Sequence, residues 1–233
     1  DSTRPGAIYC AELDGTGEIY VPFTDVPDAS ATWDAGGADA MMDTKWNWEG
    51  DETPNLVNGG LLATFAAGST ALTPYAVALR GLLFRTTEES FTVSPSGDNQ
   101  SVTLMGAGLV TERGEGVGIV QTNTIENSLV VAKPQPWVVG ANTILELNGD
   151  VGSIGVSAVT KDGAGALHLR GHNTFFGEFV HSNGIVDVWT DDALGDSSTA
   201  YRIARTKGGQ NTQLRLHGVT VTRPIIYHPL SGD

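Results

Sequence analysis

Cysteine and long apolar runs are scarce in this sequence, and both shortages exclude something. The single cysteine, Cys10, has no partner for an internal disulfide, and a zinc site built from cysteines is excluded. Its place in the apolar run 7–11 predicts a buried structural thiol. No stretch approaches the roughly 18 apolar residues that a membrane-spanning helix needs. We therefore expect no membrane insertion of this segment.

Basic residues are also few. The chain has 13 lysines and arginines against 27 aspartates and glutamates, a net charge of −14. Such a surface repels phosphate backbones and offers no basic cluster to anionic membranes, so nucleic acid is not an expected partner. Solubility is the ordinary explanation of this charge. Because the chain starts at Asp1 with no signal peptide, we interpret it as a mature or excised piece.

Helical periodicity is missing as well. Charged residues make up only 17% of the chain, and 30 glycines and 10 prolines interrupt it throughout. No window of a dozen residues carries an apolar stripe at helical spacing with helix-forming neighbours. This composition is typical of strands joined by polar turns, and it predicts an all-β fold.

The first fifty residues divide into two segments. In residues 1–30, two short apolar runs flank the turn Asp14-Gly15-Thr16-Gly17, which predicts a hairpin. Residues 31–54 hold three tryptophans among Asp and Gly, and we interpret them as a cap or loop that closes one end of the core.

From residue 55 onward, short strands recur every ~8–12 residues, and several alternate strictly between apolar and polar side chains. We predict strands at 61–65, 82–84, 91–93, 102–104, 129–131, 143–147, 166–169, 179–180, 185–188, 213–216 and 219–221. The alternation fits a β-sandwich and a β-solenoid equally. The repeated unit of strand, Gly or Asn turn and strand favours the solenoid, because each unit exposes its apolar face until the next one stacks on it.

One segment resembles a known repeat. Residues 160–186 read TKDGAGALHLRGHNTFFGEFVHSNGIV, and Asp192-Ala193-Leu194-Gly195 follow. This closely resembles the autotransporter-associated β-strand repeat of passenger-type surface proteins, with Lys161, the glycines, Leu167, Leu169 and Asn173 at the motif positions. The Trp-rich segment also looks like the opening of such a passenger region.

The resemblance implies a right-handed parallel β-solenoid that is secreted or displayed on a bacterial cell surface. It implies no catalytic residue. It covers one repeat at 160–195 and, more loosely, residues 31–195, so the predicted solenoid domain at 55–233 extends beyond it. Residues 1–30 and 200–233 depart from the pattern.

Histidines and acidic clusters are candidate metal ligands. His168, His172 and His181 fall within one repeat, but no metal-binding spacing is present, and we expect surface histidines, with His168 directed to solvent. Two groups of aspartates could hold Ca²⁺, although neither follows a known calcium loop. These are Asp34, Asp39 and Asp43, and Asp191, Asp192 and Asp196. Turn formation is the alternative explanation for them, and no other cofactor is expected.

A carbohydrate site is the best binding hypothesis, because exposed tryptophan rings stack on sugars while Asp and Asn bind hydroxyls. The candidate residues are Trp33, Trp46, Trp48, Asp34 and Asn47. The alternative is that these tryptophans seal the end of the core.

Glu146, Glu178 and Asp187 face outward by alternation and could line a groove, as glycoside cleavage would require. No recognised catalytic constellation accompanies them.

The sequence therefore favours a non-catalytic structural or adhesive segment of a larger extracellular protein, with a glycan or a surface protein as partner. The alternatives are an accessory carbohydrate-binding module and a fragment of a β-helical polysaccharide-degrading enzyme. Because open solenoid ends favour strand pairing, end-to-end self-association is a further prediction.

Overall fold

The computed structural model describes residues 12–13, 19–20, 29–114, 118–204 and 212–228. The predicted burial of Cys10 lies outside these residues. Two short strands, β1 (Glu12–Leu13) and β2 (Ile19–Tyr20), pair antiparallel, which is the pairing that a hairpin requires.

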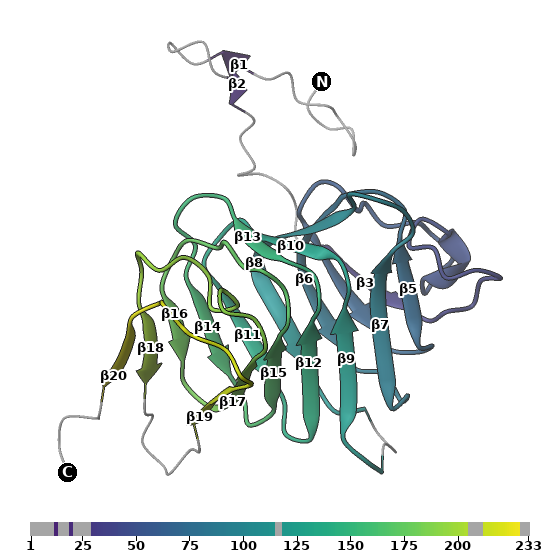
Figure 1. Cartoon of the computed structure of the whole chain (residues 1–233). Coiled ribbons are helices and arrows are strands. Elements are labelled where there is room, and N and C mark those ends of the chain that lie inside the picture. The colour runs from purple at the N-terminus through teal and green to yellow at the C-terminus, as the bar shows by residue number, and fades with distance from the viewer. Residues whose placement is uncertain (1–11, 14–18, 21–28, 115–117, 205–211, 229–233) are drawn as a thin grey trace.

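The chain from β3 to β20 winds into a parallel β-solenoid of about six turns, which confirms the predicted fold class (Figure 1). Every pair of strands named below is parallel, so the antiparallel β-sandwich alternative is wrong. The only helix among the described residues is the single 3₁₀ turn η2 (Lys45–Asn47).

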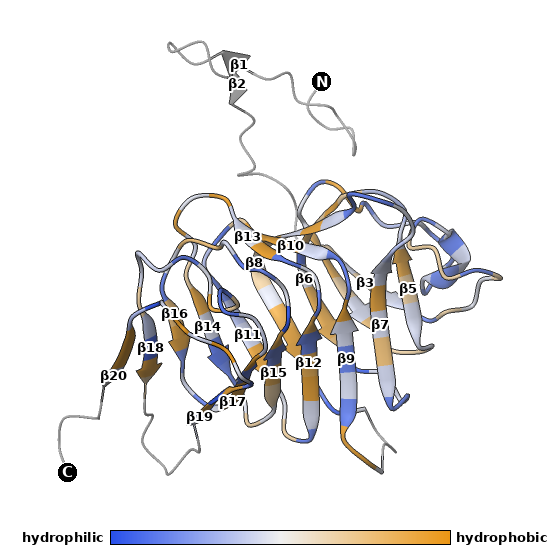
Figure 2. Ribbon diagram, viewed as in Figure 1, coloured by the Kyte–Doolittle hydropathy of each residue, from blue (hydrophilic) through white to orange (hydrophobic). Residues whose placement is uncertain are grey.

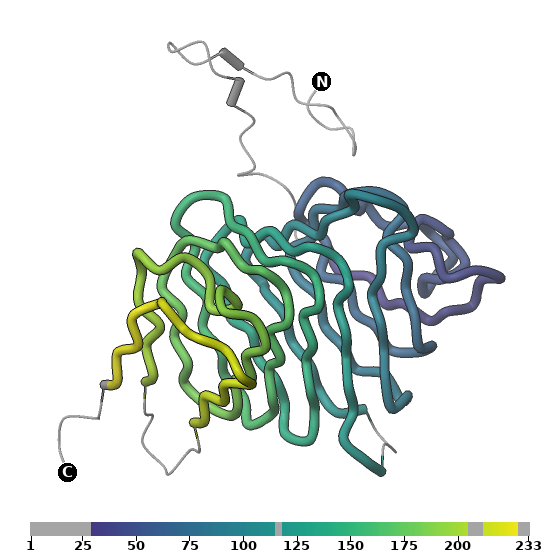
Figure 3. Tube along the Cα trace, viewed as in Figure 1, coloured from purple at the N-terminus to yellow at the C-terminus, as the bar shows by residue number. Residues whose placement is uncertain are grey.

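Two sheets form the long walls of the solenoid, and successive coils stack along its axis (Figure 3). The eleven-stranded sheet contains β3 (Ala29–Trp33), β4 (Leu61–Phe65), β6 (Val77–Phe84), β8 (Ser101–Thr111), β10 (Ser128–Val131), β11 (Gln135–Val139), β13 (Val151–Ser153), β14 (Val159–Asp162), β16 (Phe179–His181), β18 (Tyr201–Ala204) and β20 (Ile225–His228). The seven-stranded sheet contains β5 (Thr70–Thr73), β7 (Ser90–Pro95), β9 (Gln121–Ile125), β12 (Thr143–Leu147), β15 (Ala166–Leu169), β17 (Gly184–Val188) and β19 (Thr212–Leu216).

The middle coils have a third face, because β8 turns a corner within its length. Its first residues pair with β10 and its last residues pair with β11. Gly106 and Gly108 lie at the corner with φ of 121° and 74°, a region that favours glycine. A Cβ on Gly108 would lie 1.8 Å from the carbonyl oxygen of Pro136 on the next coil, so only glycine fits there.

Alternation along each strand places one apolar column over the next. Leu145, Leu167 and Val186 are paired in register across β12, β15 and β17, and all three are buried. The hydropathy pattern of Figure 2 shows the same alternation along the strands. Since each buried aliphatic side chain contributes roughly 1.5–3 kcal/mol, this shared core is a major source of stability.

Buried polar side chains close the corners of the repeat segment. Lys161 is fully buried, and its Nζ donates to the carbonyl oxygens of Asp162, Gly163 and Asn183, each at 2.9 Å. Asn173 accepts from Val151 N at 2.7 Å and donates to Ala193 O at 2.5 Å. Each side chain therefore joins neighbouring coils where no strand hydrogen bond does so.

The two ends of the solenoid differ. At the first coil, β3 pairs with β4, and Met41 forms a parallel bridge to Leu72 of β5. Trp33 and Trp48 pack edge to face there, with ring centroids 5.3 Å apart. At the other end, β19 and β20 are the last strands of their sheets. The solenoid thus begins at β3, which spans the predicted boundary between residues 1–30 and the cap or loop at 31–54.

One predicted strand is wrong. Residues 219–221 form an irregular connection in which Thr220 N donates to Asp191 Oδ1 at 2.8 Å. The strand of this coil is β20 instead, which pairs with β18. Alternation alone wrongly predicted a strand at 219–221, because Val219 and Val221 pack partly against the core without pairing with a neighbouring strand.

We expect Lys161→Met to lower the free energy of unfolding by about 2–4 kcal/mol, because three partly buried carbonyl groups lose their charged donor. Urea unfolding followed by circular dichroism measures the change. Lys133→Met is the matched control, since Lys133 is exposed and should tolerate the substitution. Equal stability of the two variants would contradict the structural role of Lys161.

Candidate functional site

The tryptophans proposed for glycan stacking lie in different environments. Trp33 and Trp48 are 0% exposed, so neither ring face is open to a ligand. The indole nitrogen of Trp48 donates to Met42 O at 2.7 Å. Trp46 is 56% exposed, with Lys45 Nζ 5.0 Å from the ring centroid. Of this group, only Trp46 offers its ring to solvent.

The polar candidates of the same segment serve its turns. Asp34 is exposed and accepts from Gly36 N at 3.0 Å. Asn47 is fully buried, where its Oδ1 accepts from Gly37 N at 2.9 Å and its Nδ2 donates to Met41 O at 3.0 Å. The structure therefore does not gather the five predicted carbohydrate-binding residues into one open site.

The aspartates considered for Ca²⁺ also bind local partners. Asp39 accepts from Met41 N and Thr44 Oγ1, and these hydrogen bonds, the backbone one foremost, lower its pKa. Asp196 accepts from the Ser198 hydroxyl and backbone N–H, which likewise lower its pKa. Among the described residues, no group of three or more His, Cys, Asp or Glu side chains is arranged to hold a metal ion.

The most organised polar surface lies on the outer face of the seven-stranded sheet. Glu146, His168 and Asp187 are paired in register on β12, β15 and β17. His168 Nδ1 lies 3.1 Å from Glu146 Oε1, and His168 Nε2 lies 3.5 Å from Asp187 Oδ2. We call these three residues the imidazole–carboxylate row. The prediction that His168 faces outward is correct, although carboxylates enclose its ring.

A second row lies beside the first, where these strands end. The Trp189 ring stacks on His217 with centroids 4.1 Å apart and an interplanar angle of 1°. The Arg170 guanidinium lies 4.1 Å from the centroid of the same indole ring. We call these residues the Arg–Trp–His stack. His217 Nε2 also lies 2.6 Å from Asp187 Oδ1, which joins the stack to the imidazole–carboxylate row.

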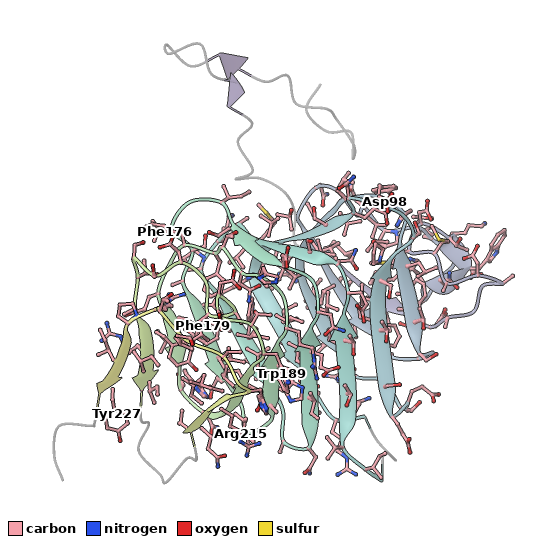
Figure 4. All side chains as sticks on the ribbon, viewed as in Figure 1. Asp98, Phe176, Phe179, Trp189, Arg215 and Tyr227 are labelled. Carbon is pink, nitrogen blue, oxygen red and sulfur yellow. The ribbon has the colours of Figure 1, made fainter. Side chains whose placement is uncertain are left out.

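A shallow depression of about 570 Å³ opens beside this stack. Figure 4 labels Trp189 and Arg215 near β17 and β19, toward the same end of the solenoid. The depression is lined by His172, Trp189, Thr190, Asp191, Asp192, His217, Gly218, Val219 and Thr222. A second depression, of about 460 Å³ beside Asp98, has no aromatic lining. Only the first combines an indole, imidazoles and carboxylates.

The pKa of Glu146 is shifted in the direction opposite to that of a general acid. Burial raises the pKa of Glu146, but hydrogen bonds and charges from His168 and Arg170 outweigh it, so the net shift is downward. A general acid that cleaves glycosides needs a raised pKa. Glu178 lies elsewhere and pairs with Arg202. The three predicted outward carboxylates therefore do not meet in one groove.

The most strongly shifted titratable groups are sealed in the interior. Burial lowers the pKa of Lys161 to about 8 and that of His181 to about 4. Burial also raises the pKa of Tyr201, whose hydroxyl lies 2.7 Å from His181 Nδ1. Shifted groups often mark active sites, but these three are 0% exposed, and no substrate can reach them as they lie.

The expectation of surface histidines is therefore wrong for His181. This residue alternates inward with Phe179 on β16, and its Nε2 lies 3.1 Å from Gly184 O. His168 and His172 are also apart from it, on the outer sheet face and beside Asp192. The side chain of His228 lies outside the described residues.

Comparison of the chain with protein-family models, curated proteins and solved structures found no match. None of the helices in the described part of the chain has the length and apolarity to cross a membrane.

Sequence reasoning missed the Arg–Trp–His stack. Arg170, Trp189 and His217 each follow the last residue of a strand, outside the alternating runs from which outward positions were inferred. What the three residues share is their position, because each directly follows the aliphatic residue that ends its strand. That signal becomes visible only when the strand register is known.

We expect the stability of the fold to fall as pH drops from 6.5 toward 4, with His181 contributing up to about 3 kcal/mol. The folded pKa lies below the unfolded one, so protonation favours the unfolded chain. Urea unfolding across this pH range measures the slope. His181→Asn should flatten it, whereas His172→Asn, at an exposed position, should not. Identical slopes in both variants would rule out His181 as the source.

Proposed function

We propose that this chain is a non-catalytic structural segment of a larger bacterial protein that is secreted or displayed on the cell surface. The observation that carries the proposal is the unbroken parallel stacking of coils from β3 to β20 around one core. Such a stack holds its shape along its axis through continuous main-chain ladders. It is suited to extend, connect or present other parts of a protein.

The resemblance of residues 160–195 to the autotransporter-associated repeat supports this proposal. Its characteristic residues have structural roles in this chain. Lys161 and Asn173 satisfy corner groups, and a Cβ on Gly163, Gly165 or Gly177 would meet a carbonyl oxygen of the preceding coil at 2.2–2.4 Å. A motif that serves stacking rather than chemistry fits a stalk or passenger segment.

The polar outer surface fits the same role. Glu146, His168 and Asp187 satisfy one another across three neighbouring coils, and Arg85 pairs with Glu112 across two others. These side-chain contacts link coils on the solvent side, as the apolar columns do inside. The net charge of −14 keeps an exposed surface of this kind soluble.

We expect antibodies raised against the purified chain to label intact cells of the bacterium that produces it, or to find the protein in its culture medium. Brief protease treatment of intact cells should remove the label from the cell surface. A cytoplasmic protein, followed in the same cells, is the control for lysis. Detection only after lysis would contradict the proposed location.

A second candidate function is glycan binding, and the depression beside the Arg–Trp–His stack favours it. Trp33, Trp48 and Trp137 are buried, whereas Trp189 lies at the rim of an open depression with two carboxylates. Asp191 and Asp192 have further acceptor capacity for sugar hydroxyls, while the indole edge and His217 provide apolar contact. This site differs from the Trp-rich segment that the sequence suggested.

We expect a glycan-array screen, with and without calcium, to show saturable binding that Asp192→Asn weakens about tenfold through loss of a charged acceptor. Trp46→Ala is the matched control, because Trp46 lies exposed on the first coil. Loss of binding in the control alone would move the site to the first coil. No binding by the unaltered chain would leave only the structural proposal.

A further inference from the structure

A reactive dipeptide lies at the corner that follows β14. Asp162 ends this strand with an exposed side chain, and Gly163 follows it with φ of 80°. Gly163 N donates to Asp162 Oδ1 at 2.7 Å, so the main-chain nitrogen lies close to the carboxyl group of the preceding residue. Attack of this nitrogen on the carboxyl carbon closes a cyclic imide, the succinimide. Groups held in contact in this way react much faster than freely moving ones.

This contact distinguishes the dipeptide from the others of its kind. The described residues include three more pairs in which Asn or Asp precedes glycine. These pairs begin at Asn58, Asn148 and Asn183. Asn58 Oδ1 accepts from Gly60 N, which lies one residue too far along the chain to close the ring. Within the described part of the chain, the hydrogen bond from a glycine N–H to the side chain directly before it occurs only at Asp162.

Lys161 supplies a positive charge beside the amide that must lose its proton. The anion of the Gly163 amide carries much of its negative charge on Asp162 O, the oxygen of the same peptide group. Lys161 Nζ donates to this oxygen at 2.9 Å from a fully buried position. Burial lowers the pKa of Lys161 to about 8, so the ammonium form predominates below that pH. A fixed donor aimed at an oxygen on which charge develops is the arrangement that accelerates acyl transfer in enzymes.

We propose that Asp162 and Gly163 form a cyclic imide spontaneously in the folded chain, and that the imide opens to isoaspartate at position 162. The Gly163 N–H proton passes to water, and the nitrogen forms a bond to Asp162 Cγ. The C–O bond of the protonated carboxyl group breaks, and its oxygen leaves as water. Water then adds to the main-chain carbonyl carbon of Asp162, and the bond from this carbon to nitrogen breaks. The chain now runs through Cβ and Cγ, with its mass unchanged.

The reaction moves a negative charge from the surface toward the interior. Before it, the exposed side chain of Asp162 carries the charge. After it, the carboxylate is the former main-chain carbonyl group, whose oxygen accepts from Lys161 Nζ. The ammonium group that promotes ring closure thus becomes the ion-pair partner of the product. Since a hydrogen bond between two charged groups is stronger than one to a neutral carbonyl, isoaspartate is favoured over return to aspartate. The inference does not depend on the proposed function.

The test is peptide mapping by mass spectrometry after prolonged incubation of the whole chain at about pH 6, where Lys161 is charged. We expect a peptide of unchanged mass and altered retention, with isoaspartate at position 162. It should form at least about tenfold faster in the folded chain than in the chain unfolded in guanidinium chloride, where Lys161 no longer holds Asp162 O. Equal or slower formation in the folded chain, or no isoaspartate at this position, would overturn the proposal.

Variants test the role of Lys161. Lys161→Met should slow the reaction to the rate of the unfolded chain, whereas Lys133→Met, at an exposed lysine, should leave it unchanged. Circular dichroism shows whether each variant is folded. A folded Lys161→Met chain that reacts at the unaltered rate would contradict the activation by Lys161.

A second measurement does not require the Lys161 variant to fold. In Asp162→Asn, ammonia leaves in place of water, so ring closure can be followed at alkaline pH by the mass gain of deamidation. The ratio of the folded to the unfolded rate should fall as pH rises through about 8, because Lys161 loses its charge there. A ratio that is independent of pH would contradict the proposal.

Discussion

The parallel main-chain ladder is the constraint on which the rest of this structure depends. A coil cannot satisfy its own strand edges or bury its own apolar face, so each is stable only against its neighbours. The ladder fixes side-chain register, because Leu145, Leu167 and Val186 must stack once their strands pair. It also dictates the corners, where the chain leaves one sheet for the other and its carbonyl groups lose their strand partners.

Those corners explain why a solenoid with an apolar core buries charged and amide side chains. Lys161 supplies three donors to carbonyl groups of two successive turns, and Asn173 bridges main-chain groups on either side of it. Arg223 serves the last coil in the same way by donating to Leu194 O and Gly177 O. Leaving such groups unpaired would cost more than burying the side chains that satisfy them.

Strand positions were predictable where alternation was strict, as at 61–65, 143–147 and 166–169, because a two-residue period distinguishes inside from outside. The pairing of the strands was not predictable, because the number of residues per coil varies. Ile144 pairs with Ala166, 22 residues later, whereas Ala166 pairs with Ile185, 19 residues later. His181 was predicted at the surface because no metal-binding spacing accompanied it, whereas the alternation along β16 directs its side chain inward. Predicting the site on the outer sheet face requires the pairing register of the strands as well as the alternation of inward and outward positions. No single coil reveals that register.

Register also distinguishes inward positions, which stacking of the coils determines, from outward positions, which it does not. Inward positions are dictated by stacking, so they describe the fold and little else. Outward positions are free of that demand, yet Glu146, His168 and Asp187 occupy matched places on three successive coils and leave their carboxylates and imidazole in contact. The Arg–Trp–His stack continues the arrangement toward β19. A row of this kind carries information that stacking does not require, so it is at outward positions, rather than in the core, that a site can be distinguished from the fold.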